Sequence, residues 1–201
     1  APGPAMAGPT EEDAEALYEY SRRGKVAEVR VLLERGVAPD RFVAYDGSTA
    51  VVIAARGGHG EVVGMLLAAG AALDTRTDDG SALLVHAASG GSVEAARALL
   101  RSRADPNEAN EDGVTPLMLA GDVGHVEVIR LLLDARADVS VVAEEWGSAL
   151  DAAEASGHAE VAALLAAAGA RPADPASRAG ERKVAAGEKW GYDAFDGEKD
   201  Y

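Results

Sequence analysis

The sequence predicts an all-α solenoid, in which helix-turn-helix repeats stack side by side, with hairpin-like fingers between them and an extended C-terminal tail. Two observations support this prediction. Turn signals recur every 33 residues through most of the chain. The second helix of each repeat is apolar on most of its surface, so it needs cover on both sides, and only neighbouring repeats can provide that cover.

The clearest repeat runs from Asn110 to Ser140 (NEDGVTPLMLAGDVGHVEVIRLLLDARADVS). Its Asp-Gly pair predicts a tight turn, because glycine adopts positive φ without a steric clash. Thr115 and Pro116 predict the start of a short helix, since threonine caps free backbone N–H groups and proline is tolerated in the first turn. Gly124-His125 ends that helix, and a second, mostly apolar helix follows over residues 126–133.

The same features recur at the same spacing along the chain. The turn glycines, 33 residues apart, are Gly47, Gly80 and Gly113. The residues after the second turn, at the same spacing, are His59, Ser92, His125 and His158. A less regular first repeat matches the second at an offset of 34, which indicates one inserted residue near Val43. We therefore expect about five repeats, at residues 11–40, 44–76, 77–109, 110–142 and 143–171.

These elements resemble the ankyrin repeat. The D-G-x-T-P-L and G-H-x-E-V-x-x-L-L-L elements recur together and in register, roughly from Glu12 to Arg171. The resemblance implies an ankyrin-type solenoid in which the first and last repeats are atypical. It also implies that the finger tips and the inner face of the first helix of each repeat form a concave surface for protein partners.

Composition and charge exclude some classes of function. A net charge of −15 and a pI of about 4.6 argue against a nucleic-acid binder, which needs a basic face. The same charge favours a protein partner with a basic or mixed-charge surface. The chain has no cysteine, and no apolar run reaches the roughly 18 residues of a membrane span. We expect a soluble chain that is monomeric in isolation.

The N-terminal ten residues, rich in proline and glycine, predict an irregular leader. Thr10 followed by three acidic residues predicts a capped helix start. The alanine-rich composition and the first residue, Ala1, suggest an organellar protein that has lost a transit peptide. The chloroplast stroma is the compartment that we predict.

The sequence offers no catalytic or metal-binding arrangement. It has no Ser-His-Asp order, HExxH motif, phosphate loop or dinucleotide motif, so we expect neither an enzyme nor a cofactor. His59, His125 and His158 occupy the site where ankyrin-like repeats commonly carry histidine for a turn hydrogen bond, which indicates a structural role. His86 is alone on the first helix of the third repeat, where we expect a packed or rim histidine.

Two positions depart from the repeat pattern. The residue that ends the second helix is glycine in three repeats but Arg103 and Arg136 in two. This site usually needs positive φ, so either those helices end differently or the arginines serve another purpose. In the last repeat Trp146-Gly147 replaces the Asp-Gly turn, so we expect an altered finger.

The candidate docking residues lie on the predicted fingers and at the ends of the first helices. Acidic residues without a turn role recur at 33-residue spacing as Asp78, Glu111 and Glu144, and they form either a solvated edge or a strip that receives a basic partner. Predicted apolar anchors beside them are Phe42, Tyr45 and Trp146. The predicted groove-facing helix ends carry Arg56, Ser89, Asp122 and Val123.

The tail, residues 172–201, leaves the repeat pattern. Residues 172–189 have the composition of a linker. The last 12 residues then carry four aromatic side chains among acids: Trp190, Tyr192, Phe195 and Tyr201. Such a segment is typical of a partner-binding contact, in which aromatic residues are anchors. The alternative is a tail that folds back over the end of the array.

Three functions follow from these features. The first is an interaction module or adaptor that binds a partner through the concave acidic face and the aromatic tail. The second is a permanent structural subunit of a large complex, which the predicted compartment would make an organellar one. The third is a regulator that docks on an enzyme.

Overall fold

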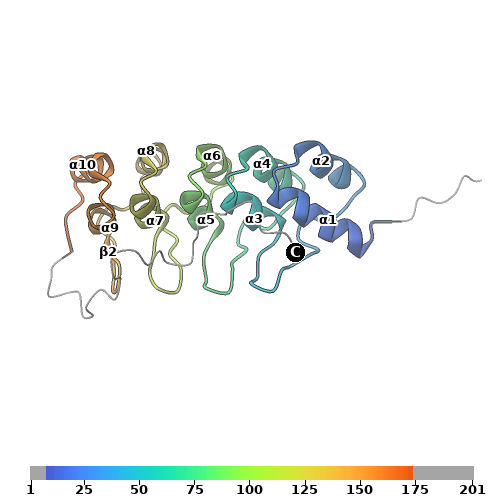
Figure 1. The fold of residues 1–201 in the computed structure, drawn as a ribbon, viewed down its shortest axis with the longest axis horizontal. Helices are drawn as coiled ribbons and strands as arrows, with labels where there is room; N and C mark the ends of the chain where they lie inside the picture. The colour runs from blue at the N-terminus through green and yellow to red at the C-terminus, as the bar shows by residue number, and fades with distance from the viewer. Residues whose placement is uncertain (1–7, 174–201) are drawn as a thin grey trace, which may run out of the picture.

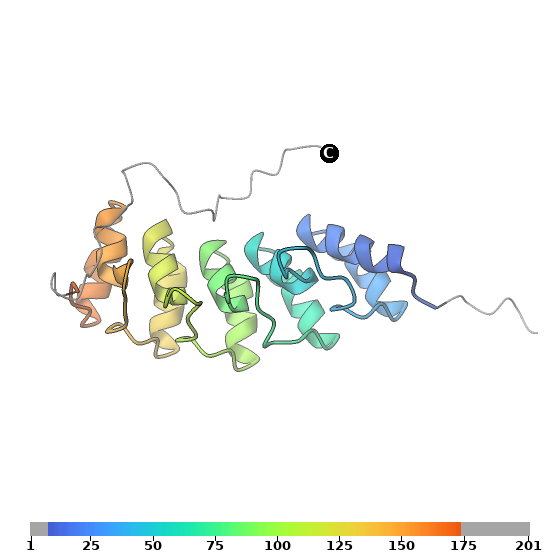
Figure 2. The same ribbon diagram turned by 90° about the horizontal axis from the view of Figure 1, so that it is seen from below.

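The computed structural model describes residues 8–173, which form ten helices in five antiparallel pairs stacked in a row (Figures 1 and 2). The inner helices, on the same side of the array as the fingers, are α1 (Glu11–Arg22), α3 (Ala50–Arg56), α5 (Leu83–Ser89), α7 (Pro116–Val123) and α9 (Ala149–Ala155). The outer helices are α2 (Val26–Glu34), α4 (Gly60–Ala68), α6 (Val93–Arg101), α8 (Val126–Asp134) and α10 (Ala159–Ala167). Two short strands, β1 (Val142–Ala143) and β2 (Gly147–Ser148), pair antiparallel in the last finger. The predicted all-α solenoid is confirmed.

Side-chain caps start helices where the sequence predicts them. The Thr10 hydroxyl accepts a hydrogen bond from the N–H of Asp13 at 3.2 Å, and the Asp13 carboxylate accepts one from the N–H of Thr10 at 2.9 Å. This capping box, together with the charge of Arg35, holds the pKa of Asp13 below its usual value. Thr115 caps α7 by accepting the N–H of Met118 at 3.3 Å. Both predicted helix starts are confirmed.

Small side chains let the inner helices pack closely against one another. The alanine pairs are fully buried at Ala54-Ala55, Ala87-Ala88 and Ala152-Ala153. At Gly121 of α7, an added Cβ would lie 2.9 Å from the carbonyl oxygen of Ala149, at the start of α9. This distance is shorter than real Cβ contacts, so the approach of these two helices requires glycine at position 121.

Histidines after the second turn join neighbouring helix pairs. Nε2 of His59 lies 3.0 Å from the carbonyl oxygen of Arg22 at the end of α1, and Nε2 of His125 lies 3.1 Å from that of Ser89 at the end of α5. A carbonyl only accepts, so each Nε2 carries the proton and satisfies a carbonyl that is free at a helix end. The predicted structural role is confirmed for these two, but the acceptor lies in the preceding pair rather than in the same turn.

All five outer helices end with the same backbone geometry, including the two that lack glycine. The residue at the turn is Gly36 (φ 84°), Gly70 (95°), Arg103 (70°), Arg136 (65°) and Gly169 (96°). In each case the next N–H bonds to a carbonyl five residues earlier, as from Ala104 to Leu99 at 3.1 Å. Left-handed backbone costs a residue other than glycine roughly 1–2 kcal/mol. The two arginines therefore occupy strained positions where glycine serves the other repeats.

The last finger is altered, as predicted, and the cause is Trp146. This residue falls at the position of the turn glycine Gly113 one repeat earlier, but the positive φ (73°) moves to the next residue, Gly147. Trp146 is only 5% exposed and packs in the core. The prediction that Trp146 is an exposed anchor for a partner is therefore wrong. The indole ring is buried in the core at the end of the array.

A histidine occupies the core at a site that is apolar in three other repeats. Its counterparts at 33-residue spacing are Ile53, Leu119 and Ala152. His86 is 1% exposed, and its Nε2 lies 3.1 Å from Oγ1 of Thr77 in the preceding finger. Burial and the charge of Arg56 lower the pKa of His86 to about 4, although Asp79 and Asp46 act in the opposite direction. The imidazole is therefore neutral at pH 7.

The stacked core makes Leu132→Asp a test of the register. Leu132 of α8 is fully buried, so the substitution places an unpaired carboxylate in the core, and we expect the free energy of unfolding to fall by about 3 kcal/mol or more. In the same helix, Glu127→Gln at an exposed site is the control, with an expected change within about 0.5 kcal/mol. An unchanged urea midpoint for Leu132→Asp would refute the register.

His86 should make the stability depend on pH. The pKa of His86 is about 4 in the folded chain against an ordinary value of 6.5, so the unfolded chain binds the proton more tightly. The stability linked to this group is complete above pH 6.5 and is lost as the pH falls toward 4, by about 3 kcal/mol in total.

His86→Leu, which installs the residue type of Leu119, should remove that part of the pH dependence. Urea unfolding of both proteins from pH 7 to pH 4 measures the difference between their free energies. Two parallel curves would show that His86 does not titrate as described.

Candidate docking surface

Four fingers project from the array, one before each of α3, α5, α7 and α9 (Figures 1 and 2). In the first three, a backbone N–H closes the turn on a carbonyl oxygen: Ala44 to Ser48 at 2.8 Å, Thr77 to Ser81 at 3.3 Å, and Asn110 to Val114 at 3.1 Å. The pairing of β1 with β2 closes the fourth. Each finger thus has a backbone held by hydrogen bonds.

Side-chain hydrogen bonds within the fingers also stabilise these turns. The Asp79 carboxylate accepts hydrogen bonds from the N–H and the hydroxyl of Ser81, at 3.1 and 2.7 Å, and so stabilises the turn at Gly80. In the third finger, Oδ1 of Asn110 performs this role by accepting the N–H groups of Asp112 (3.1 Å) and Val114 (2.8 Å). Sequence reasoning missed Asn110, although asparagine at the first position of a four-residue turn is itself a turn signal.

Hydrogen bonds also join neighbouring fingers. The N–H of Asp78 donates to the carbonyl oxygen of Asp46 at 3.1 Å, and the N–H of Glu111 donates to that of Asp79 at 3.3 Å. The side chain of Asp78 lies against the preceding finger, where an added Cβ on Gly47 would be 3.1 Å from its Oδ1. These bonds hold the first three finger tips in a row.

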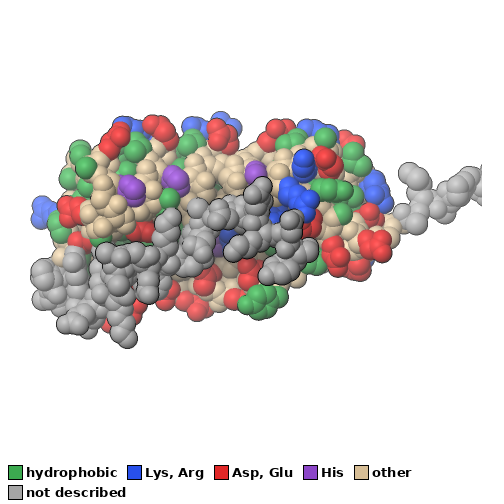
Figure 3. All heavy atoms as spheres, in the orientation of Figure 1, with side chains coloured by type: hydrophobic (Ala, Val, Ile, Leu, Met, Phe, Trp, Pro, Cys, Tyr) green, Lys and Arg blue, Asp and Glu red, His purple; other side chains and the backbone are tan. Residues whose placement is uncertain are grey.

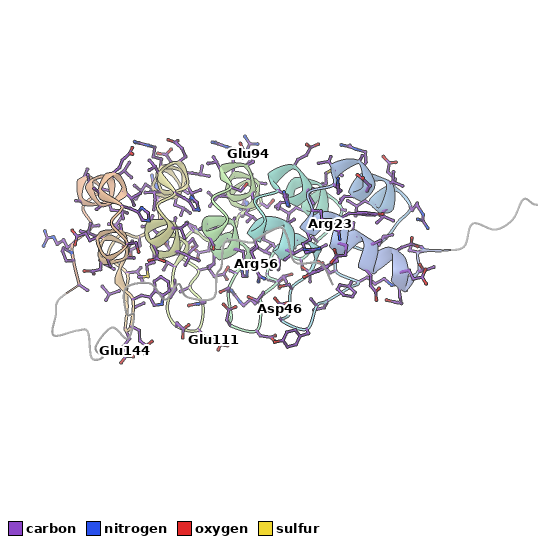
Figure 4. All side chains as sticks on the ribbon, in the orientation of Figure 1. Arg23, Asp46, Arg56, Glu94, Glu111 and Glu144 are labelled. Atoms are coloured by element: carbon purple, nitrogen blue, oxygen red, sulfur yellow. The ribbon has the colours of Figure 1, made fainter. Side chains whose placement is uncertain are left out.

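Three exposed acids lie on the second, third and fourth fingers: Asp78, Glu111 and Glu144, which we call the acidic strip. Figure 4 shows Glu111 and Glu144 at the tips of their fingers. Within residues 8–173, none of the three forms an ion pair with a basic side chain. No basic side chain of the described residues therefore neutralises the charges of the strip.

In the second half of the array, the basic side chains lie only in the outer layer. Between residues 77 and 170 the basic side chains all lie in or just after α6 and α8: Arg97, Arg101, Arg103, Arg130 and Arg136. In the same range, all charged side chains of the fingers and inner helices are acidic. Figure 3 shows red side chains along the lower edge, where the fingers lie, and both blue and red side chains near the top edge, over the outer helices.

The first finger differs from the other three. Tyr45 holds the position that Asp78 holds one repeat later, and its side chain is 99% exposed. Asp46 pairs with Arg56 of α3 at 3.4 Å (Figure 4). Burial would raise the pKa of Asp46, but hydrogen bonds from Ser48 and the charge of Arg56 outweigh it and hold that pKa below its usual value. This finger therefore offers an aromatic ring rather than a free charge.

The other predicted docking residues are distributed more widely. Phe42 is half-buried against the ring of Tyr18, with centroids 5.1 Å apart, so packing uses much of its surface. Ser89, Asp122 and Val123 are at least partly exposed at the ends of α5 and α7. Asp122 accepts a hydrogen bond from Ser156 at 2.6 Å, and no hydrogen bond within residues 8–173 links these three side chains to a finger. The predicted tail contacts, from Trp190 to Tyr201, lie outside the described residues.

Comparison with known families identifies the repeats. A family model of ankyrin repeats in three copies matches residues 66–143 and again residues 84–176, and a model of the single ankyrin repeat matches residues 46–78. A comparison with curated proteins found no significant match. In the part of the chain that the structure describes, no helix is both long and apolar enough to cross a membrane. Ankyrin repeats are generally protein–protein interaction modules, and the matches span more than half of this sequence. The chain belongs to the ankyrin repeat family.

Proposed function

We propose that this chain is a non-enzymatic adaptor that binds a protein partner with a basic or mixed-charge surface along the acidic strip. The observation that supports the proposal is the row of three exposed acids without basic partners on fingers that are held in place. Each exposed ion pair with a partner contributes only about 0.2–1 kcal/mol. A row of acids also attracts a basic partner over distance and accelerates its association.

Tyr45 gives this surface an apolar anchor. Its ring is exposed at the tip of the first finger, in line with the acidic strip. Tyrosine is enriched among the residues that dominate binding energy, because it buries a large area at a small cost in conformational entropy. We propose that the partner places an apolar group on Tyr45 and basic groups on the strip.

The aromatic tail is a second contact in this proposal. Trp190, Tyr192, Phe195 and Tyr201 follow a linker on the same chain, so binding at one site raises the effective concentration at the other. Two modest contacts can then hold a partner, or two components of an assembly, without an extensive interface. A chloroplast location remains a prediction from composition.

The second candidate function is a permanent subunit of a large complex. Val43 and Val142, which occupy the same position in the first and last fingers, are 55% and 44% exposed, and such apolar groups would be covered in a fixed assembly. Gel filtration separates the two functions: a soluble monomer supports the adaptor, and obligate association supports the permanent subunit. The third function, a regulator, is the case in which the partner of the adaptor is an enzyme.

The acidic strip is tested by a triple substitution, Asp78→Lys, Glu111→Lys and Glu144→Lys. The side chains are exposed, so we expect the melting temperature to change little and partner capture to fall. The measurement is quantitative pull-down from the source organism with the full-length chain immobilised. Binding to the unaltered chain should also weaken as salt is raised.

The matched control is Glu28→Lys, Glu34→Lys and Glu160→Lys, at exposed sites on outer helices, which changes the net charge equally. Capture that is unaffected by the strip variant, or reduced equally by the control, would contradict the proposed docking surface. A chain without residues 190–201 tests the tail separately, since loss of capture there with an intact strip assigns binding to the tail.

A further inference from the structure

Among the described residues, the majority of the basic side chains form ion pairs. The arginines in such pairs are Arg22, Arg23, Arg30, Arg35, Arg41, Arg56, Arg76 and Arg130. Four exposed arginines on or beside α6 and α8 differ from these: Arg97, Arg101, Arg103 and Arg136, which we call the arginine patch. None of the four forms an ion pair with an acid of residues 8–173.

The fold brings these four side chains to one region of the outer layer. Arg97 and Arg101 are four residues apart, so they lie on the same side of α6. Arg103 and Arg136 occupy equivalent turns, one repeat apart, at the ends of two helices that pack against each other. The patch is therefore limited to two adjacent helices, on the layer opposite the fingers (Figure 1).

Acids on the same two helices do not cancel this charge. Glu94, Glu127 and Asp134 face five arginines over α6, α8 and their final turns, and Glu127 is 3.7 Å from Arg130. Figure 4 shows Glu94 on the outer layer, on α6. From the start of each helix to Arg103 and Arg136 the arginines outnumber the acids by five to three, and two exposed acids, Asp105 and Asp138, follow just after those turns.

The backbone gives a second, independent reason to assign a role to the patch. Arg103 and Arg136 adopt φ of 70° and 65°, where three other repeats use glycine for the same turn. Glycine would form this turn without strain, so the turn itself does not explain arginine. A reason for arginine at these two positions must therefore come from its guanidinium group, which glycine lacks.

We propose that the arginine patch binds an acidic segment of a protein partner, on the face of the array opposite the acidic strip. Guanidinium groups recognise carboxylates through paired, charge-assisted hydrogen bonds. A short acidic segment fits a positive region that is confined to two helices. A nucleic acid carries charge along its whole length and would extend onto the acidic remainder of the surface. The inference is independent of the proposed role of the strip.

The test measures binding of a fluorescein-labelled peptide of about eight Asp and Glu residues, which when extended exceeds the roughly 10 Å between neighbouring helices. Fluorescence anisotropy with the full-length chain at low salt gives the affinity. We expect the double variant Arg103→Gly, Arg136→Gly to bind about fivefold more weakly. Its melting temperature should rise, because glycine relieves the backbone strain.

The control is Arg23→Gln with Arg30→Gln, which removes two exposed positive charges that already have acidic partners. It should weaken binding less than twofold, by roughly the loss of long-range attraction alone. Equal weakening in both variants, or no measurable peptide binding to the unaltered chain, would overturn the proposal. So would a lower melting temperature of the glycine variant, because it would assign the arginines a structural role.

Two further probes separate the sources of negative charge. A single-stranded oligonucleotide and vesicles containing anionic lipid are compared with the peptide at equal ionic strength. Weaker binding of both supports a protein partner. Tighter binding of either one, lost in the glycine variant, would overturn the assignment to an acidic protein segment.

Discussion

The fold depends on the mutual burial of apolar helix faces that no single repeat can cover. Helix α7 packs between α5 and α9, and its Leu117, Leu119 and Ala120 are fully buried. In an isolated repeat these side chains would face water, at a cost of about 25 cal/mol for each Å² of apolar area. Alanine and glycine on the inner helices bring neighbouring backbones together, and His59 and His125 add hydrogen bonds between adjacent pairs.

The stacking of repeats determines how charged residues are arranged on the surface. Residues at equivalent positions fall in rows, so a charge that recurs at 33-residue spacing becomes a line of charge along the array. The acidic strip follows the finger tips, and the arginine patch lies on the outer helices. Two layers of helices, each about 10 Å across, separate them by more than the Debye length of about 8 Å at physiological salt. The two surfaces therefore act as separate electrostatic sites.

The repeat pattern was enough to predict the parts of the structure that every repeat shares. These include the paired helices, the caps at Thr10 and Thr115 and the finger turns. The exposure of Asp78, Glu111 and Glu144 also agrees with the sequence prediction, because a finger tip has no core to enter. The predicted role of these acids in binding stays a prediction.

Residues that differ between repeats could not be placed in this way. Trp146 shifts a turn glycine by one residue and enters the core, which depends on the space at the end of the array. His86 replaces an apolar residue, and only the structure shows Thr77 beside it. For Arg103 and Arg136, the sequence left open whether their helices end differently. The structure shows that the backbone keeps the common geometry and accepts the strain.

The dependence of each repeat on its neighbours is tested most directly by far-ultraviolet circular dichroism of a peptide of residues 110–142 beside the full-length chain. The account predicts the spectrum of an unfolded peptide for the isolated repeat, without a cooperative thermal transition. The full-length chain should give a helical spectrum that is lost cooperatively on heating. A helical, cooperatively melting peptide would contradict the claim that neighbouring repeats complete one another.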